Sequence, residues 1–599
     1  MNLIHATIKS FDIVYRIEKK RIWLTIFDLV VKIIHSFIFG VIFFKYFLDV
    51  LFEEKDIQLA VILIFLQLIW HVFYYFHDQW HQNIYLKCSN ARVKEKVYSG
   101  LFAKTIGIEM ARIDSPEYYD DFRLVLRQSA DAMLSITDTF FKYMKDMILL
   151  LLNGTLFLFY EPIYAIFIVL NVFCTYVTNL ASNKYQVQKT GALNPVQRKY
   201  DYVKRTFYTE SAAVDLKTSK VYDVILKSED SANCEMQQVL DLYNTKLFRV
   251  EAVAELSRNV FGKLPYILLG IKAILTKLYT SSDIAVIVLS MGNTRNSLNS
   301  IISIYPELQK SGIYVEKYLE YMKSESKIPA NKGGKQPKEG ANAIRIRDVS
   351  FSYDGEKEVL SHINMDIRAG EKVAIVGENG AGKSTLVKLL LRLYIPREGE
   401  IELDEVPAQE YNLEAYRDRF GVAFQDTRLY CATVAENVWM DTCTEGESER
   451  VVQALKSSGI YSRVAEAARG IETTVTREFD PDGIEFSGGQ AQKIALARVF
   501  ARDSGIVILD EPSAALDPMS EAEMFDNMLR AAEKRTVVMI SHRLSACRGA
   551  DMIYVLSGGR IVEQGTHQEL TAAGGMYANM WETQASGYID LQIVGEKCT

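Results

Sequence analysis

A glycine-rich segment at residues 377–385, GENGAGKST, has the residue types and spacing of a loop that binds phosphate. Its glycines let the backbone wrap closely around an anion, so that several N–H groups point inward at the start of a helix. We expect the Lys383 ammonium to reach the β- and γ-phosphates and the Ser384 hydroxyl to bind magnesium. The apolar run at residues 372–376 predicts the buried strand from which such a loop emerges.

Three further side chains with chemistry follow predicted strands. Asp510 and Glu511 come directly after the apolar run at residues 506–509, and His542 follows VVMIS. An acidic residue at a strand end can hold magnesium through water, and a neighbouring carboxylate can polarise an attacking water. We therefore assign Asp510 to magnesium, Glu511 to the role of catalytic base and His542 to a contact with the γ-phosphate. An isolated Asp-Glu pair is usually a solvated loop, so these assignments depend on their order along the chain.

These segments together resemble the nucleotide-binding domain of ABC transporters, and the resemblance covers the second half of the chain. The residues that carry it are Tyr353 in VSFSYDG, Gly377, Glu378, Asn379, Gly380, Ala381, Gly382, Lys383, Ser384 and Thr385 in the phosphate loop, Gln425 in GVAFQD, Ser487, Gly488, Gly489 and Gln490 in FSGGQ, residues 513–517 after ILDEP, and His542. The one departure is Phe486, where leucine is usual, and it replaces one apolar side chain by another.

The resemblance implies a role for each of these elements. Tyr353 would stack on adenine, and Gln425 would contact magnesium and the membrane domain. The segment Ser487 to Gln490 would complete an ATP site built by a second nucleotide domain, with residues 513–517 as the D-loop and His542 as the switch histidine. ATP and magnesium are the cofactors that follow from this reading.

The first half of the chain contains long runs of aliphatic and aromatic residues. These runs are candidates for the membrane spans that ATP hydrolysis would move. Residues 57–76 contain 20 residues with no charged side chain except His71, which is enough to cross a bilayer. We predict six spans in all. The other five, at residues 22–50, 147–160, 163–180, 260–278 and 284–305, are less apolar than residues 57–76. A mean hydropathy of 0.00 for the whole chain hides this division.

Charge placement predicts the orientation of the spans. The short connections at residues 53–56, 161–162 and 279–283 carry almost no basic residues, whereas residues 87–104 and 184–205 are rich in Lys and Arg. Basic segments stay on the cytoplasmic side, so we expect both termini to be cytoplasmic. The long basic segments also permit helices that continue far beyond the bilayer, and we expect these helices to turn at residues 115–122 and 212–220.

Polar residues crowd the last predicted span between Asn293 and Ser300, with Arg295 near its middle. A charged side chain in a span is costly unless it faces water, a ligand or a partner charge. Two interpretations stay open. Arg295 either lines the transport pathway and contacts an anionic or carbonyl-rich cargo, or it pairs with a carboxylate across the helix bundle.

The predicted fold is a membrane all-α six-helix domain followed by an α/β P-loop NTPase domain. We expect the membrane domain, with its long helix extensions, over residues 1–322 and the nucleotide-binding domain over residues 343–585. Residues 323–342 hold two prolines and three glycines without apolar periodicity and predict a linker. Residues 586–599 remain as a C-terminal tail.

The resemblance implies an ATP-driven transporter in the membrane, and more specifically a half-transporter of the six-span exporter type. An exporter of a peptide, drug-like or lipid cargo is our first hypothesis; the segment DSPEYYDDF resembles bacterial peptide and bacteriocin exporters and suggests a bacterial cell membrane. An importer of the same architecture, for example for siderophores, and a lipid flippase are the alternatives. A soluble ABC-type ATPase with a helical arm is disfavoured by the charge-free run at residues 57–76.

Partners follow from the same reading. Each catalytic element occurs once, so the chain is half of a transporter, and a homodimer with two active sites suffices, with a different second subunit as the alternative. Membrane lipids and a cargo are further expected partners. A net charge of −7 over 599 residues gives no sign of nucleic-acid binding. The seven cysteines are scattered and predict free thiols, with neither disulfides nor a CxxC metal site.

Overall fold

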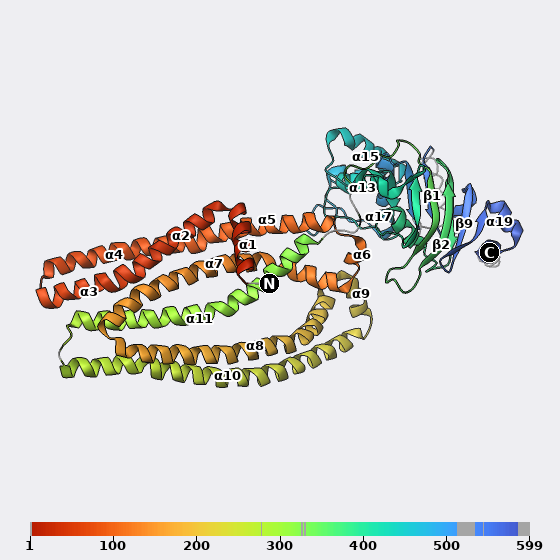
Figure 1. Cartoon of the computed structure of the whole chain (residues 1–599). Coiled ribbons are helices and arrows are strands. Elements are labelled where there is room, and N and C mark those ends of the chain that lie inside the picture. The colour runs from red at the N-terminus through yellow and green to blue at the C-terminus, as the bar shows by residue number, and fades with distance from the viewer. Residues whose placement is uncertain are drawn as a thin grey trace. The chain divides into compact units, whose positions relative to one another are not determined.

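The computed structural model describes residues 3–276, 278–324, 328, 331–511, 534–542 and 544–584. It divides into two compact units, which are treated separately below (Figure 1). Unit 1 comprises residues 1–106 and 119–324, and unit 2 comprises residues 107–118 and 325–599. A segment from the N-terminal half therefore belongs to the C-terminal unit.

Unit 1 is built from long helices. They are α1 (Leu3–Ile17), α2 (Lys19–Ile33), α3 (Phe43–Leu48), α4 (Ile57–Gln79), α5 (Leu86–Ile106), α7 (Pro116–Tyr160), α8 (Ala165–Tyr208), α9 (Glu210–Thr218), α10 (Val221–Thr276) and α11 (Ser281–Lys323). This unit also has three π-helical segments among its described residues. The first, η1 (Ile34–Ile42), joins α2 to α3, and η2 (Asp49–Glu54) follows α3. The third, η3 (Trp80–Tyr85), joins α4 to α5. Among the described residues these π-helical segments occur only within the first two long helical stretches.

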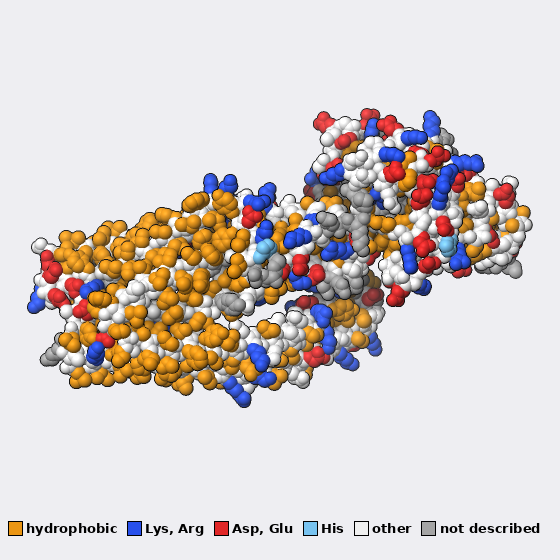
Figure 2. Space-filling model, in the orientation of Figure 1, with side chains coloured by type: hydrophobic (Ala, Val, Ile, Leu, Met, Phe, Trp, Pro, Cys, Tyr) orange, Lys and Arg blue, Asp and Glu red, His pale blue; other side chains and the backbone are white. Residues whose placement is uncertain are grey.

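Five of the long helical stretches are apolar enough to cross a bilayer. They are Lys19–Glu54, Ile57–Ile106, Asp121–Tyr160, Pro162–Tyr208 and Val221–Thr276. Figure 2 shows the hydrophobic side chains that cover this unit. The sixth predicted span lies on α11, a helix of 43 residues that does not reach the same hydropathy. Its polar residues, including Asn293 and Arg295, lower that value, as the sequence indicated.

The short connections between the spans have recognisable turn chemistry. Lys55 takes a left-handed conformation with φ of 55° at the end of η2, and the Asp56 side chain then accepts a hydrogen bond from the Leu59 N–H, which caps α4. Thr280 and Asp283 form a capping box at the start of α11. The local sequence thus ends one helix and begins the next within a few residues.

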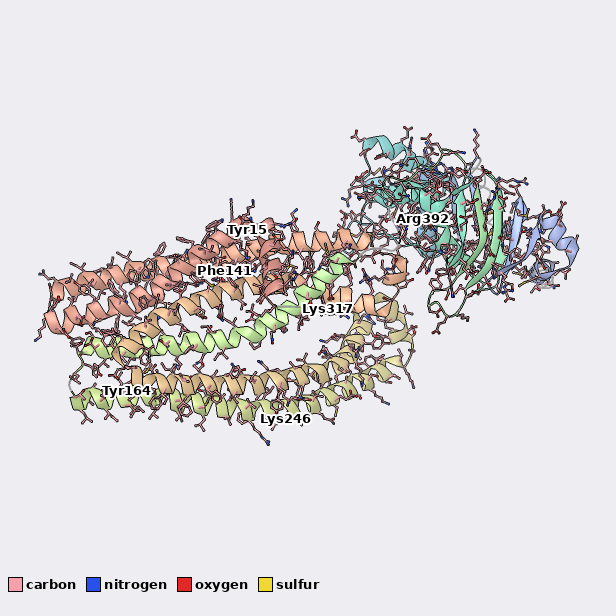
Figure 3. All side chains as sticks on the ribbon, viewed as in Figure 1. Tyr15, Phe141, Tyr164, Lys246, Lys317 and Arg392 are labelled. Atoms are coloured by element: carbon pink, nitrogen blue, oxygen red, sulfur yellow. The ribbon has the colours of Figure 1, made fainter. Side chains whose placement is uncertain are left out.

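Inside unit 1, α8 and α10 run side by side along much of their length (Figure 1). A buried cluster near one end of the spans joins α7, α8, α10 and α11 through Phe157, Tyr164, Ile168, Leu269, Ile287 and Met291. Tyr164 is labelled in Figure 3. Burial of such side chains contributes about 1.5–3 kcal/mol each relative to water, but in a bilayer close packing rather than water exclusion holds helices together.

The two predicted turns between long helices differ in accuracy. The second, expected at residues 212–220, corresponds to α9 (Glu210–Thr218). The first was expected at residues 115–122, but the short turn helix is α6 (Met110–Ile113), and α7 has already begun at Pro116. Proline is favourable at the first turn of a helix, where its missing N–H is not needed, so Pro116 marks the start of α7 and not a bend.

Unit 2 contains two sheets. The smaller is antiparallel with the order β2-β1-β4-β5, from β1 (Ile344–Phe351), β2 (Leu360–Ile367), β4 (Glu398–Leu403) and β5 (Val406–Pro407). The larger has the order β10-β9-β3-β8-β7-β6, from β3 (Lys372–Gly377), β6 (Phe420–Ala423), β7 (Ile506–Asp510), β8 (Thr536–Ile540), β9 (Met552–Ser557) and β10 (Arg560–Gly565). All its pairings are parallel except that of β10 with β9.

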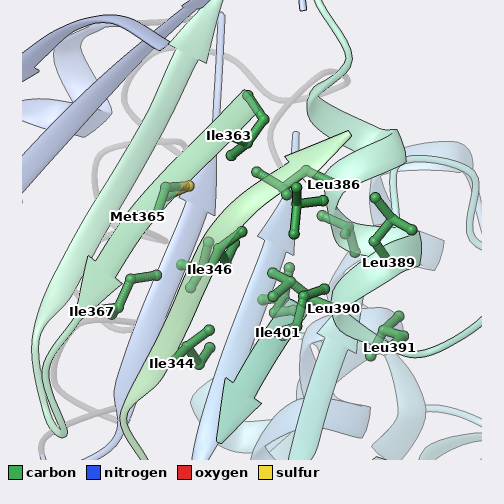
Figure 4. Packing of buried hydrophobic residues seen from close by; sticks show 14 of the residues in the cluster. Ile344, Ile346, Ile363, Met365, Ile367, Leu386, Leu389, Leu390, Leu391 and Ile401 are labelled. Carbon is green, nitrogen blue, oxygen red and sulfur yellow. The ribbon is translucent and has the colours of Figure 1, made fainter. Parts of the chain in front are cut away.

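Helices cover these sheets: α12 (Lys383–Leu390), α13 (Leu413–Asp418), α14 (Val434–Trp439), α15 (Glu445–Ser457), α16 (Tyr461–Ala465), α17 (Gly488–Ala501) and α19 (His567–Ala573). Short 3₁₀ turns of this unit are η5 (Ala408–Glu410), η6 (Gly470–Glu472) and η7 (Leu544–Gly549), whereas η4 (Pro162–Tyr164) precedes α8 in unit 1. The main core lies where the side chains of α12, such as Leu386 and Leu390, meet Ile346 and Ile401 of the smaller sheet (Figure 4). This packing fixes the position of α12 and of the loop that precedes it.

The six cysteines among the described residues are all free.

Candidate nucleotide site

The glycine-rich loop leaves the end of β3 and enters α12 at Lys383, as the sequence predicted. Gly380 and Gly382 have φ values of 82° and 105°, in the left-handed region that L residues rarely adopt. Two of the loop glycines also have no space for a side chain. A Cβ at Gly377 would lie 2.1 Å from the Leu556 carbonyl oxygen, and one at Gly382 would lie 2.6 Å from a Leu360 methyl carbon.

Lys383 is held within this loop. Its side chain is 6 % exposed, and its ammonium donates hydrogen bonds to the carbonyl oxygens of Gly377, at 2.7 Å, and Glu378, at 3.0 Å. Burial lowers the pKa of Lys383, and the nearby carboxylates of Glu511 and Asp510 oppose that shift. A cation in this position lies where the loop would receive an anion.

Asp510 ends the buried strand β7, and only 5 % of it is exposed. Burial raises the pKa of the Asp510 carboxyl, and a hydrogen bond with Ser384 opposes the rise. A hydroxyl and a carboxylate side by side are oxygen groups that suit magnesium, which commonly takes its remaining ligands from phosphate and water. Among the described residues no group of three or more His, Cys, Asp or Glu side chains is arranged to hold a metal ion by itself.

Glu511 is the point where three predicted residues meet. The Gln425 amide donates to one Glu511 carboxylate oxygen at 3.0 Å, and Nδ1 of His542 lies 3.3 Å from the other. Glu511 has φ of 48°, and its backbone N–H donates to the Ile540 carbonyl oxygen at 3.0 Å, which ties it to the end of β8. A non-glycine residue in the left-handed region is uncommon and often marks a functional position.

These groups surround one cavity of about 640 Å³. Its walls include Asn379, Gly380, Gly382, Lys383, Ser384, Thr385, Gln425, Glu511 and His542, together with Val359. The volume lies in the range of cavities that bind small molecules. The structure therefore brings together residues that the sequence singled out in four separate segments: the phosphate loop, Gln425, Glu511 and His542.

Other predicted residues lie outside the walls of this cavity. The Tyr353 ring is half exposed, and its hydroxyl forms a hydrogen bond of 3.0 Å with Thr385 Oγ1, next to the phosphate loop. Ser487 caps α17 in a capping box with Gln490, and neither these two nor Gly488 and Gly489 belong to the cavity walls found among the described residues. Residues 513–517 lie outside the described residues.

Two features of unit 2 were missed at the level of the sequence. Val359 lines the cavity just before β2, but a single valine carries no signature. The other is a contact of α6 with the main body of the unit: the Tyr394 hydroxyl donates a hydrogen bond to Asp114, and Met110 packs on the main core. Burial, together with Asp114, raises the pKa of Tyr394. The acidic segment around residue 115 was the only available signal for this contact.

Arg295 of unit 1 is half buried, and its guanidinium donates to the Gly262 carbonyl oxygen of α10 at 3.4 Å. A Cβ at Gly262 would lie 2.6 Å from the Arg295 guanidinium, so this glycine leaves room for the end of the Arg295 side chain. Within the described residues no carboxylate forms an ion pair with Arg295. A cross-helix contact between Asn293 and Asn153, at 3.3 Å, adds to the polar face of α11.

Comparisons with known proteins agree with this geometry. Residues 360–514 match the family model described as ABC transporter. An uncharacterised ABC transporter ATP-binding protein, YwjA, of Bacillus subtilis is 37 % identical over 290 residues, which is 48 % of this chain and 49 % of that protein. An ATP-dependent lipid A-core flippase of Francisella tularensis is 38 % identical over 257 residues, or 43 % of this chain and 41 % of that protein. In each case the chain spans less than half the length of the curated relative that it matches.

The fold as a whole also has a solved counterpart. The structure of a bacterial Atm1-family ABC exporter with ATP bound superimposes with a TM-score of 0.72, at 21 % identity, over 95 % of this chain and 98 % of that one. This likeness shows the fold, and it confirms the predicted fold class of a helical membrane domain followed by an α/β nucleotide-binding domain.

Proposed function

We propose that this chain, whose unit 2 is the nucleotide-binding domain of an ABC transporter, is one half of an ATP-driven exporter in a cell membrane. The observation that carries the proposal is the meeting of Lys383, Glu511 and His542 around one cavity, on a chain whose other unit has five helices apolar enough to span a bilayer. The solved counterpart with the same fold is an exporter, and this supports export as the direction that we propose.

The residues of the cavity have separate roles in hydrolysis. The loop N–H groups and the Lys383 ammonium would bind the phosphates of ATP, since both are donors at a helix N-terminus. Glu511 would accept a proton from the attacking water, and its hydrogen bond from Gln425 holds one carboxylate oxygen in place. His542, 3.3 Å from the other oxygen, would contact the γ-phosphate.

Magnesium is the metal expected at this site, and Ser384 and Asp510 would hold it. The two side chains fit that role because the Ser384 hydroxyl hydrogen-bonds to the Asp510 carboxylate, which puts two hard oxygen groups at one point. When bound, the metal would neutralise part of the phosphate charge. Asp510 remains buried at its strand end, which fixes its orientation for this purpose.

A second copy of the chain is the partner we propose. Ser487 and Gln490 form the N-terminus of α17, a second anion-binding element, yet the cavity formed by Lys383 and Glu511 does not include them. Two nucleotide domains arranged head to tail would bring Ser487 of each to the phosphate held by the other. Because one chain carries all the elements, a homodimer is sufficient, and closure of the two domains over ATP would shift the membrane units between two packings.

The spans would be oriented with both termini and the nucleotide-binding unit in the cytoplasm, where ATP is present. The basic segments 87–104 and 184–205 support this orientation. For the cargo, the polar face around Arg295 is the contact region that we propose, since its guanidinium has a carbonyl partner and no carboxylate partner among the described residues. A peptide, drug-like or lipid cargo fits the proposal.

The test is ATP hydrolysis by the full chain in lipid vesicles, followed by uptake of candidate cargoes into vesicles whose nucleotide domains face outward. We expect magnesium-dependent hydrolysis that is lost in Lys383→Ala, and uptake that requires ATP. A wild-type rate of ATP hydrolysis no higher than that of Lys383→Ala would contradict the ATPase assignment. Uptake only into vesicles of the opposite orientation would support an importer instead.

A further inference from the structure

A second cavity, of about 520 Å³, lies within unit 1 between α2, η1, α4, η3 and α7. Phe141 of α7, labelled in Figure 3, lines it. Two of the three π-helical segments contribute to its walls, His35 from η1 and His81 from η3. Insertions of this kind within a helix are frequent at functional sites. Nothing in the nucleotide chemistry accounts for this cavity.

Three lysines line the cavity, and two of them are paired with carboxylates. The Lys32 ammonium lies 3.0 Å from Asp28 and 3.1 Å from Asp78, and Lys145 lies 3.3 Å from Asp146. Lys142 has no ion pair among the described residues. An ammonium has three N–H donors, so these pairings leave donors free on all three lysines. The remaining acidic wall residue, Asp138, is already bound by two hydrogen bonds from the buried Arg21.

Two histidines also line the cavity. Trp70 Nε1 donates to His35 Nδ1 at 3.2 Å, which leaves the ring proton of a neutral His35 on Nε2. His81 is 1 % exposed; its Nδ1 lies 3.5 Å from the buried Asp28 carboxylate, and its Nε2 has no hydrogen-bond partner among the described residues. A buried polar group without a partner is costly, so such a group indicates a ligand that would satisfy it.

The position of the cavity along the spans can be derived from the helix rise. Its residues on α4 and η3, such as Tyr74 and Gln82, lie 17 and 25 residues beyond Ile57, the start of α4. At 1.5 Å per residue this is about 25–38 Å from the outer end of the span. The hydrocarbon core of a bilayer is about 30 Å thick, so the cavity lies near its inner boundary. The exposed Trp23 and Trp80 nearby are residues that favour this boundary.

From these observations we propose that the cavity binds the phosphate group of an anionic phospholipid from the cytoplasmic leaflet. Phosphate oxygens accept hydrogen bonds and match a wall of lysine and histidine donors. A lipid is favoured over a soluble phosphate because the cavity lies at headgroup depth. In addition, Phe27 on α2 and Phe76 on α4 expose apolar surface for acyl chains. The depth argument rests on the orientation given in the proposed function.

The experiment measures lipid retained by the full chain in detergent micelles. The purified protein is supplied with phosphatidylglycerol, and bound lipid is counted by native mass spectrometry. The same is done with phosphatidylcholine, and with inorganic phosphate as competitor. The test variant is Lys142→Gln/Lys145→Gln, which removes both charges and leaves polar side chains that are one bond shorter. Lys87→Gln is the matched control, since Lys87 is exposed at the start of α5 and does not line the cavity.

We expect retained phosphatidylglycerol to fall about tenfold in the double variant, from the loss of hydrogen bonds between charged groups, and to be unchanged in Lys87→Gln. Phosphatidylcholine should be retained weakly by all three proteins. Equal retention of phosphatidylglycerol by wild type and the double variant would overturn the site. Displacement of the lipid by millimolar inorganic phosphate would overturn its assignment to a lipid. The measurement involves no ATP, so its result is independent of whether transport is observed.

Discussion

The nucleotide site of unit 2 and the polar face of α11 in unit 1 both gather polar groups in apolar surroundings, but they hold them differently. In unit 2 the backbone positions the chemistry: Asp510 ends one buried strand, Glu511 is hydrogen-bonded to the next, and Gly377 and Gly382 of the phosphate loop have no room for side chains. In unit 1 single side-chain contacts position Arg295 and Asn293 on a continuous helix. A site fixed by backbone tolerates few residue types, whereas a helix face can change its side chains more freely.

The largest expected effect is that of Glu511→Gln. The amide keeps the shape of the side chain but cannot accept a proton, so we expect hydrolysis to fall by about 10²–10⁴ while ATP binding persists. ATP-bound protein should accumulate as a closed dimer, measured by size and by retained nucleotide. Glu449→Gln on α15 is the matched control and should hydrolyse ATP normally. Hydrolysis near the wild-type rate in Glu511→Gln would remove this residue from the role of base.

The second prediction tests whether the backbone-fixed site is complete within one chain. Homodimers of Lys383→Ala and homodimers of Ser487→Arg should both be inactive. Coexpressed and separated as heterodimers, the two variants should regain about half of the wild-type hydrolysis, because both lesions then fall in one site and the other is intact. Heterodimers as inactive as the two homodimers would contradict the head-to-tail arrangement.

A smaller effect is expected on the helix face. Arg295→Ala should reduce cargo-stimulated hydrolysis several-fold, in line with the loss of one or two charged hydrogen bonds, and leave the basal rate unchanged. Arg249→Ala, an exposed arginine on α10, serves as the control. A variant that fails to insert or fold would show that Arg295 supports the bundle through Gly262. Unchanged stimulation by every cargo tested would place Arg295 outside the pathway.

The smallest effect concerns Tyr394→Phe, which removes one hydroxyl and leaves the ring. Loss of the hydrogen bond to Asp114 should lower the unfolding free energy of unit 2 by about 0.5–1.5 kcal/mol. Thermal unfolding of the full chain, followed by a probe in unit 2, measures the change. Tyr461→Phe on α16 is the control, because it removes a tyrosine hydroxyl that makes no hydrogen bond to Asp114. An unchanged transition would mean that Asp114 finds an equivalent donor in water.

The sequence predicts the residues of the nucleotide site better than it predicts α6 and the π-helical segments, for a physical reason. Phosphate binding fixes both residue type and spacing, so the sequence could single out Lys383, Gln425, Glu511 and His542, which line one cavity in the structure. No such requirement applies to α6, whose four residues resemble an ordinary loop. The turn was therefore predicted at residues 115–122, several residues after α6. The π-helical segments were also beyond prediction, because their extra residue leaves the apolar pattern of a span almost unchanged.

The assignment of α6 to unit 2 has a consequence for how the chain is made. Asp114 and Tyr394 are separated by 280 residues, and every helix from α7 to α11 is synthesised between them. This contact can form only after residue 394 has been synthesised, and therefore after all the helices from α7 to α11. Residues 325–599 by themselves lack both Asp114 and Met110. Unit 2 therefore takes part of its surface from a segment of the N-terminal half of the chain.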